Sequence, residues 1–106
     1  MKNISLQAIP NQSLSIRLDN NIYDIVIKEA NGIMGVSITR DNILLNENIR
    51  AVSGSPIIPY KYQYIKYGNF IFLTNNEEYP YYTQFGVTQS LIYINAQELE
   101  AIIAGA

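Results

Sequence analysis

The first half of the chain alternates apolar and polar residues in short segments. Three segments repeat with a period of two residues, and a fourth is a short apolar run; they span residues 14–18, 23–27, 34–38 and 43–45. A two-residue period places successive side chains on opposite faces of a strand, so one face is buried and the other is wet. Each of these four segments is therefore predicted to be a β-strand.

The breaks between these segments predict tight turns. They contain Asp19-Asn20-Asn21, Asn31-Gly32 and Asp41-Asn42. Asn-Gly is a strong hairpin signal because both residues tolerate a positive φ. Connections this short join neighbouring antiparallel strands, so we expect the four strands to form a meander.

The second half is less regular. Residues 46–59 contain the loop-forming run Ser53-Gly54-Ser55-Pro56, and Tyr60, Tyr62 and Tyr64 then alternate with other side chains. Phe70–Leu73 is apolar on both faces, which predicts a central strand. Further along, we expect turns or loops at residues 75–78 and 79–86 and a last strand at 91–94.

The final segment has helical features. Asn95 is a good N-cap, and Glu98, three residues later, completes a capping box. Leu99, Ile102 and Ile103 share one helical face, and Gly105 suits a helix stop. We predict a helix over 96–104 that covers a sheet edge or a barrel mouth.

These elements predict an all-β fold, a small antiparallel barrel or sandwich of about seven or eight strands with a short C-terminal helix. The chain has 106 residues, which suits one domain, and it contains neither a repeat nor a linker. We therefore expect residues 1–106 to form a single domain.

The composition limits the kinds of chemistry that the chain can perform. The chain contains no histidine and no cysteine, so it lacks the usual general base, the common nucleophile pairs and a zinc ligand set. Its net charge of -2 offers no positive field for nucleic acid. We see neither a signal peptide nor a membrane span. We expect no enzyme activity, cofactor, metal, nucleic-acid or membrane partner.

Two motifs resemble catalytic features but have simpler interpretations. Glu77-Glu78 is the only adjacent acidic pair and fits a solvated turn, although carboxylates alone can serve a hydrolase. Ser53-Gly54-Ser55 lacks the pattern of a nucleophile elbow, and no base is available to activate it. A carboxylate-based hydrolase is thus the weakest of the functional hypotheses.

Tyrosines form two clusters, and these are the candidate partner-binding residues. They are Tyr60, Tyr62, Tyr64 and Tyr67 in the first cluster, and Tyr79, Tyr81 and Tyr82 in the second. Tyrosine is common in strands as a half-buried residue. It is also enriched in protein interfaces. Stacking of sugars or single-stranded nucleic acid is a third interpretation, supported by only two nearby lysines, Lys61 and Lys66.

Residues 4–19 resemble the start of the phage baseplate hub plug family, found in contractile-tailed phages. The matching features are the turn Pro10-Asn11-Gln12, the pair Leu18-Asp19 and a tyrosine, Tyr23, in the following strand. The family often has an aromatic residue after the Asn-Gly turn, where this chain has Met34 and Gly35. Weaker likeness continues to the last strand.

The resemblance implies a virion structural component that plugs or braces the central baseplate hub by protein–protein contacts. It implies baseplate hub and tail-tube initiator proteins as partners, with the tape-measure protein as a further candidate. Location would be the tail baseplate of the virion, and the host cytoplasm during assembly, with the oligomeric state set by the assembly. The alternative is a stand-alone β module that binds a glycan or other extended ligand through its tyrosine-rich face.

Overall fold

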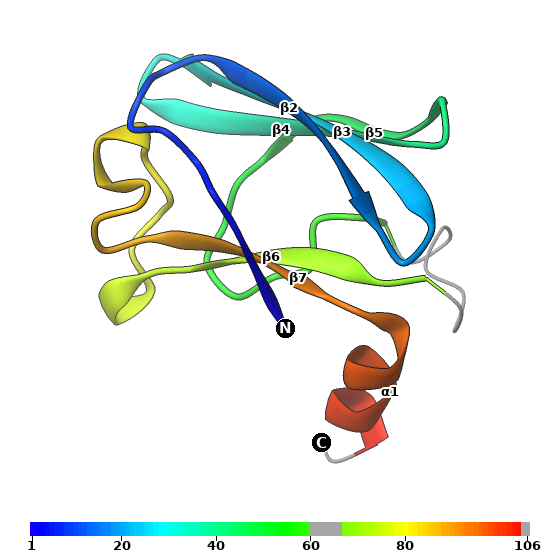
Figure 1. The fold of residues 1–106 in the computed structure, drawn as a ribbon. Coiled ribbons are helices and arrows are strands. Elements are labelled where there is room, and N and C mark those ends of the chain that lie inside the picture. Colours follow the sequence, from blue (N-terminus) through cyan, green and yellow to red (C-terminus); the bar gives the residue numbers. More distant parts are fainter. Residues whose placement is uncertain (60–66, 105–106) are drawn as a thin grey trace.

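Two antiparallel sheets face each other in the computed structural model, which describes residues 1–59 and 67–104 (Figure 1). The elements are β1 (Lys2–Ile4), β2 (Gln12–Leu18), β3 (Asn21–Ala30), β4 (Ile33–Arg40), β5 (Ile43–Arg50), β6 (Asn69–Leu73), β7 (Ser90–Ile94) and α1 (Ala96–Ala104). The all-β prediction is confirmed, with seven strands in the described ranges. The sheets do not close into a barrel, so the arrangement is that of a sandwich.

The larger sheet has the order β2-β3-β4-β5, which confirms the predicted meander. Its three hairpin turns each place two consecutive residues at positive φ: Asp19 and Asn20, Asn31 and Gly32, and Asp41 and Asn42. Two positive φ values are the requirement of a type I′ turn, whose twist matches that of the flanking strands. The Asp, Asn and Gly residues at these positions therefore fix where each strand ends.

The smaller sheet has the order β1-β7-β6, so β7 is the middle strand and β6 lies at one side. The prediction that Phe70–Leu73 would be central was wrong. The outer side of β6 is nevertheless occupied. The Phe72 and Phe70 carbonyls accept hydrogen bonds from the N–H groups of Gly54 (2.8 Å) and Ile57 (2.9 Å), respectively. A strand covered by a loop in this way has the apolar pattern of a central strand.

Apolar side chains from both sheets meet in one core. Its largest fully buried members are Tyr23, Phe70, Phe72, Phe85, Ile25, Ile27, Met34, Ile38 and Leu91. Tyr23 of the larger sheet packs edge-on against Phe70 of the smaller sheet, with ring centroids 5.2 Å apart. Tyr93 completes this aromatic cluster at 5.1 Å from Phe70. The cluster joins the two layers.

Helix α1 has the predicted bounds and the predicted capping box. The Asn95 side-chain oxygen accepts the Glu98 N–H (2.8 Å), and the Glu98 carboxylate accepts the Asn95 N–H (3.1 Å). The same carboxylate pairs with the N-terminal ammonium of Met1, which is the main reason that the pKa of Glu98 is lowered. Figure 1 shows the helix extending beyond the end of β7, away from the larger sheet. Gly105 lies outside the described residues.

Two properties of the described residues bear on other functions. No helix in this part of the chain is long and apolar enough to cross a bilayer. In the same ranges, no three acidic residues gather where they could hold a metal ion.

Candidate protein interface

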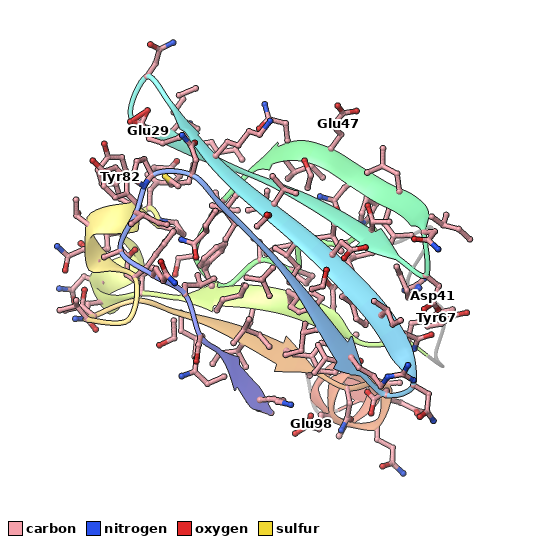
Figure 2. The ribbon with its side chains drawn as sticks, turned by 45° about the horizontal axis from the view of Figure 1, so that its top comes forward. Glu29, Asp41, Glu47, Tyr67, Tyr82 and Glu98 are labelled. Atoms are coloured by element: carbon pink, nitrogen blue, oxygen red, sulfur yellow. The ribbon has the colours of Figure 1, made fainter. Side chains whose placement is uncertain are left out.

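The structure divides the candidate tyrosines into separate groups. Tyr60, Tyr62 and Tyr64 lie outside the described residues. Tyr67 precedes β6, whereas the other three candidates follow it in the loop 79–82. Figure 2 shows Tyr67 and Tyr82 at opposite ends of the molecule. The described tyrosines therefore do not form one continuous binding face.

A buried glutamine holds the loop 79–82 in place. Gln89, only 2% exposed, accepts the Tyr81 N–H with its side-chain oxygen (2.8 Å). Its amide nitrogen donates to the Tyr79 carbonyl (3.3 Å). A buried amide that satisfies two backbone groups fixes their positions, because leaving either group unpaired would be costly. The conformation of this loop is thus set from inside the protein.

Tyr81 and Tyr82 are half-buried against the core, with ring centroids 4.7 Å apart. The Tyr81 hydroxyl donates to the Glu29 carboxylate (3.4 Å). Burial, followed by the nearby Glu29 charge, raises the pKa of Tyr81. These two tyrosines have a clear packing role, although their outer sides remain accessible.

Tyr79 is different, because 59% of its surface is exposed. The Arg50 guanidinium, from the end of β5, lies 4.1 Å from the centre of its ring. Stacking of this kind contributes about 0.5–1 kcal/mol at an exposed site and restrains both side chains. Tyrosine and arginine are among the residue types most enriched at interface hot spots. We call Tyr79, Tyr81, Tyr82 and Arg50 the tyrosine surface.

Tyr67 belongs to another environment. The guanidinium of Arg40, at the end of β4, lies 3.6 Å from its ring centre. Arg40 is only 8% exposed, so the ring contributes to covering a buried charge. This contact supports a structural role for Tyr67.

The turn residues of the family motif stabilise the start of the larger sheet. The Gln12 side chain accepts the Gln7 N–H (3.1 Å) and donates to the Gln7 carbonyl (2.7 Å). The Asn11 side chain accepts the Glu29 N–H (3.2 Å). Pro10 lies exposed in the bend that precedes β2. These contacts shape the connection between the two sheets.

The other motif residues join the sheets directly. Leu18 and Tyr23 belong to the core. Asp19, in the β2–β3 turn, accepts a hydrogen bond of 2.7 Å from the hydroxyl of Tyr93 in β7. Burial and then this bond raise the pKa of Tyr93. We call the Asp19–Tyr93 contact the inter-sheet clasp.

Sequence reasoning missed four buried polar residues, Arg40, Asn46, Asn69 and Gln89, and also the buried Tyr93. Asn69, 1% exposed, accepts the Ile58 N–H (2.8 Å) and donates to the Ile58 carbonyl (3.1 Å). For Asn69 and Gln89 the available signal was an amide at the start of an apolar strand or directly before it, since such a side chain is buried only where it finds partners.

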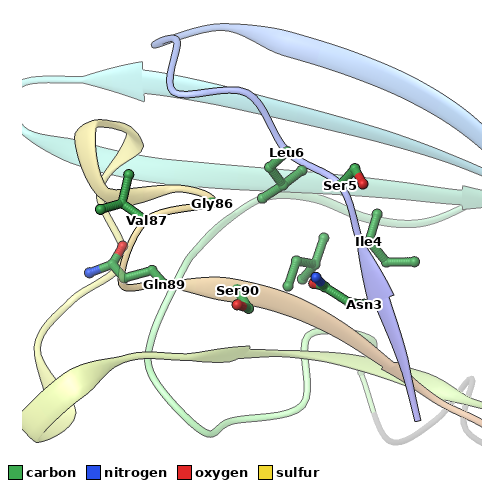
Figure 3. Close-up of a pocket in the computed structure, with 9 residues that line it drawn as sticks. Asn3, Ile4, Ser5, Leu6, Gly86, Val87, Gln89 and Ser90 are labelled. Atoms are coloured by element: carbon green, nitrogen blue, oxygen red, sulfur yellow. The ribbon is translucent and has the colours of Figure 1, made fainter.

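The surface hollows offer little for chemistry. The one in Figure 3, about 270 Å³, lies between the 3–6 segment and residues 86–91. Its lining is apolar, hydroxyl and amide in character and includes no acid or base. Two further hollows lie beside β2, and none of the three is lined by Tyr67 or by the tyrosine surface. Ser53 bonds the Thr74 hydroxyl (2.7 Å), consistent with a loop contact.

Comparison with known proteins gives a family. The model of the family described as "Cyanophage baseplate Pam3 plug gp18" matches residues 1–97, a stretch that contains all seven described strands. No curated protein sequence matches the chain. The match confirms the family resemblance, both at residues 4–19 and in the weaker likeness that continues to the last strand. The chain therefore belongs to the cyanophage baseplate Pam3 plug gp18 family and has a structural role in the phage tail baseplate.

Proposed function

We propose that this chain plugs or braces the central hub of a contractile tail baseplate through protein–protein contacts, without catalysis. The family match over residues 1–97 carries this proposal. The proposed partners are the hub and tail-tube initiator proteins, with the tape-measure protein as a further candidate. Assembly would take place in the host cytoplasm, and the oligomeric state would be set by the baseplate.

The tyrosine surface supports a binding role. Tyr79 projects from a loop that Gln89 holds in place, so docking would cost little loop entropy. Its stacked partner Arg50 adds a charge that is already positioned. Only 15% of residues are charged, compared with about 25% in a typical domain, which lowers the cost of removing water from the surface. These properties suit a subunit whose surface is covered in an assembly.

The decisive measurement is binding to purified hub and tail-tube initiator proteins. Replacing Tyr79 with Ala should weaken binding about tenfold or more, as expected for an interface tyrosine. Ile43→Ala is the matched control, because Ile43 is 63% exposed and lies on β5, outside the tyrosine surface. Both variants should unfold within a few degrees of the parent chain, since each removes an exposed side chain.

Two outcomes contradict different parts of the proposal. If Tyr79→Ala binds as well as the parent chain, the tyrosine surface is not the contact. If the parent chain binds neither protein, and phage lacking the chain assemble tails with a normally filled hub, the plug role itself is wrong.

A further inference from the structure

We propose that the outer edge of β2 is a second docking site, for an extended strand from another baseplate protein. The strand would alternate apolar and polar side chains and would place a carboxylate beside Arg17. This inference rests on the proposed function only for the source of the strand, because the edge is a property of the fold.

Strand β2 has a regular backbone whose outer side, away from β3, is unpaired among the described residues. It pairs with β3 in an unbroken register from Gln12↔Ile27 to Leu18↔Asn21, without a bulge. Ile22 directs its backbone toward β4, because its carbonyl accepts the Asp41 N–H (2.8 Å). Its β2 partner, Arg17, therefore directs its own backbone groups away from β3. By alternation, Ser13 and Ser15 do the same, and no described residue bonds these groups.

The remaining edges of the two sheets are protected. β1 has only three residues. β5 has an irregular register and carries Glu47 and the positive-φ residue Asn48 in its exposed part. The outer side of β6 receives hydrogen bonds from the 54–57 loop. Short strands, bulges, charges and covering loops are the usual devices that prevent edge pairing. Along Ser13–Arg17, β2 has no bulge and no covering loop among the described residues, and its only charge is Arg17 at the end of this stretch.

Burial indicates which side chains the incoming strand needs. Ile25 and Ile27 of β3 are 0% exposed, whereas Leu14 and Ile16 of β2, on the same inner face, are only half-buried. β2 is the outermost strand of the larger sheet (Figure 1), and its inner-face side chains Leu14 and Ile16 pack against the core only in part. A neighbouring strand with apolar residues on this face would cover Leu14 and Ile16, as β2 covers its neighbours in β3.

The charge of Arg17 indicates a further property of the partner strand. Arg17 is exposed and forms no ion pair within the described ranges. It lines a hollow of about 310 Å³ together with Lys2, Asp19 and Glu98. The two carboxylates there are engaged, Asp19 with Tyr93 and Glu98 with the N-terminal ammonium. A carboxylate on the partner strand would complement Arg17. A second copy of β2 would bring none, because Arg17 is its only charged residue.

Ser15→Pro tests the backbone contact. Because the Ser15 N–H points away from β3, proline removes a docking donor and no β2–β3 bond. Ser15→Ala is the control, since it also loses the Ser15–Asp24 hydrogen bond but keeps the N–H. Binding to each purified baseplate protein is measured for both, and the β2 edge is viewed by cryo-electron microscopy of the assembled baseplate. Proline should weaken binding about tenfold, and alanine should not.

Arg17→Glu is a second variant that leaves the backbone intact, with exposed Lys28→Glu as its charge-matched control. We expect about tenfold weaker binding for Arg17→Glu alone, even if Ser15→Pro fails to fold. A strand of another baseplate protein along Ser13–Arg17 in the assembled particle supports the inference. A second copy there, an uncovered edge, or unchanged binding of folded variants overturns it. If the particle shows the chain in the hub with β2 uncovered, the plug role stands and only the edge inference fails.

Discussion

The inter-sheet clasp can be tested by removing one oxygen atom. In Tyr93→Phe the ring stays in the aromatic cluster, but the 2.7 Å hydrogen bond to Asp19 is lost. A hydrogen bond to a charged group contributes about 1.5–3 kcal/mol. Asp19 lies at the surface, where water replaces part of the lost contact. We therefore expect the free energy of unfolding to fall by about 1–2 kcal/mol, and Tm by about 5–10 °C.

Tyr23→Phe is the matched control, because Tyr23 lies in the same cluster but its buried hydroxyl has no hydrogen-bond partner among the described residues. Removing an unsatisfied buried hydroxyl should leave stability within about 0.5 kcal/mol of the parent chain, or raise it. Urea unfolding at equal m-value compares the two variants. Equal losses, or no loss for Tyr93→Phe, would refute the assignment of the clasp as a stabilising contact.

The clasp also predicts a pH dependence. The pKa of Tyr93 is raised from its ordinary value of 10.0, so the folded chain keeps the phenolic proton where the unfolded chain loses it. This stabilisation is complete below about pH 10 and is lost as the pH rises toward the folded pKa. Tyr93→Phe should lose part of the alkaline slope of stability, which unfolding titrations between pH 8 and about 11 measure.

Two further substitutions test local assignments. Gly35→Ala should lower the free energy of unfolding in urea by about 1 kcal/mol or more, because the added Cβ would overlap the Asn48 side chain. Adding Asn48→Gly, which suits the positive φ at that position, should restore the stability; no recovery would show that the overlap is not the cause. Gln89→Leu should expose the Tyr81 amide to hydrogen exchange while the Phe70 amide, held by Asn69, stays protected. Exchange of both amides at equal rates would show instead that the glutamine supports the whole fold.

The meander could be predicted because its signals are local. Alternation of side chains and paired Asp, Asn and Gly residues determine strands and turns within about ten residues, and the capping box does the same for α1. The position of β6 could not be predicted, because it depends on a loop contact from residues 54–57. The same Phe70–Leu73 pattern suits a central strand and a strand covered by a loop.

The candidate interface could be predicted only in part from the sequence. Clustering of tyrosines along the chain marked the 79–82 loop and Tyr67 alike as candidate binding residues. In the structure Tyr67 stacks on Arg40 at the other end of β6. The Arg50–Tyr79 pair joins residues that are distant in sequence, so no local pattern reveals it. Residue type indicates what a side chain can contact, whereas the fold decides what it does contact.

The pairing of β1 with β7 has a consequence for synthesis. Lys2 lies opposite Tyr93, so the smaller sheet joins strands made at widely separated times on the ribosome. The β2–β5 hairpins need only local contacts and can form early. Their apolar inner face stays exposed until Phe70, Phe72 and Leu91 have been synthesised and can pack against it. During translation this nascent half-sandwich exposes the surface that chaperones bind and that aggregates. Slow translation through the 69–94 region should therefore lower the yield of folded chain more than slow translation through the hairpins.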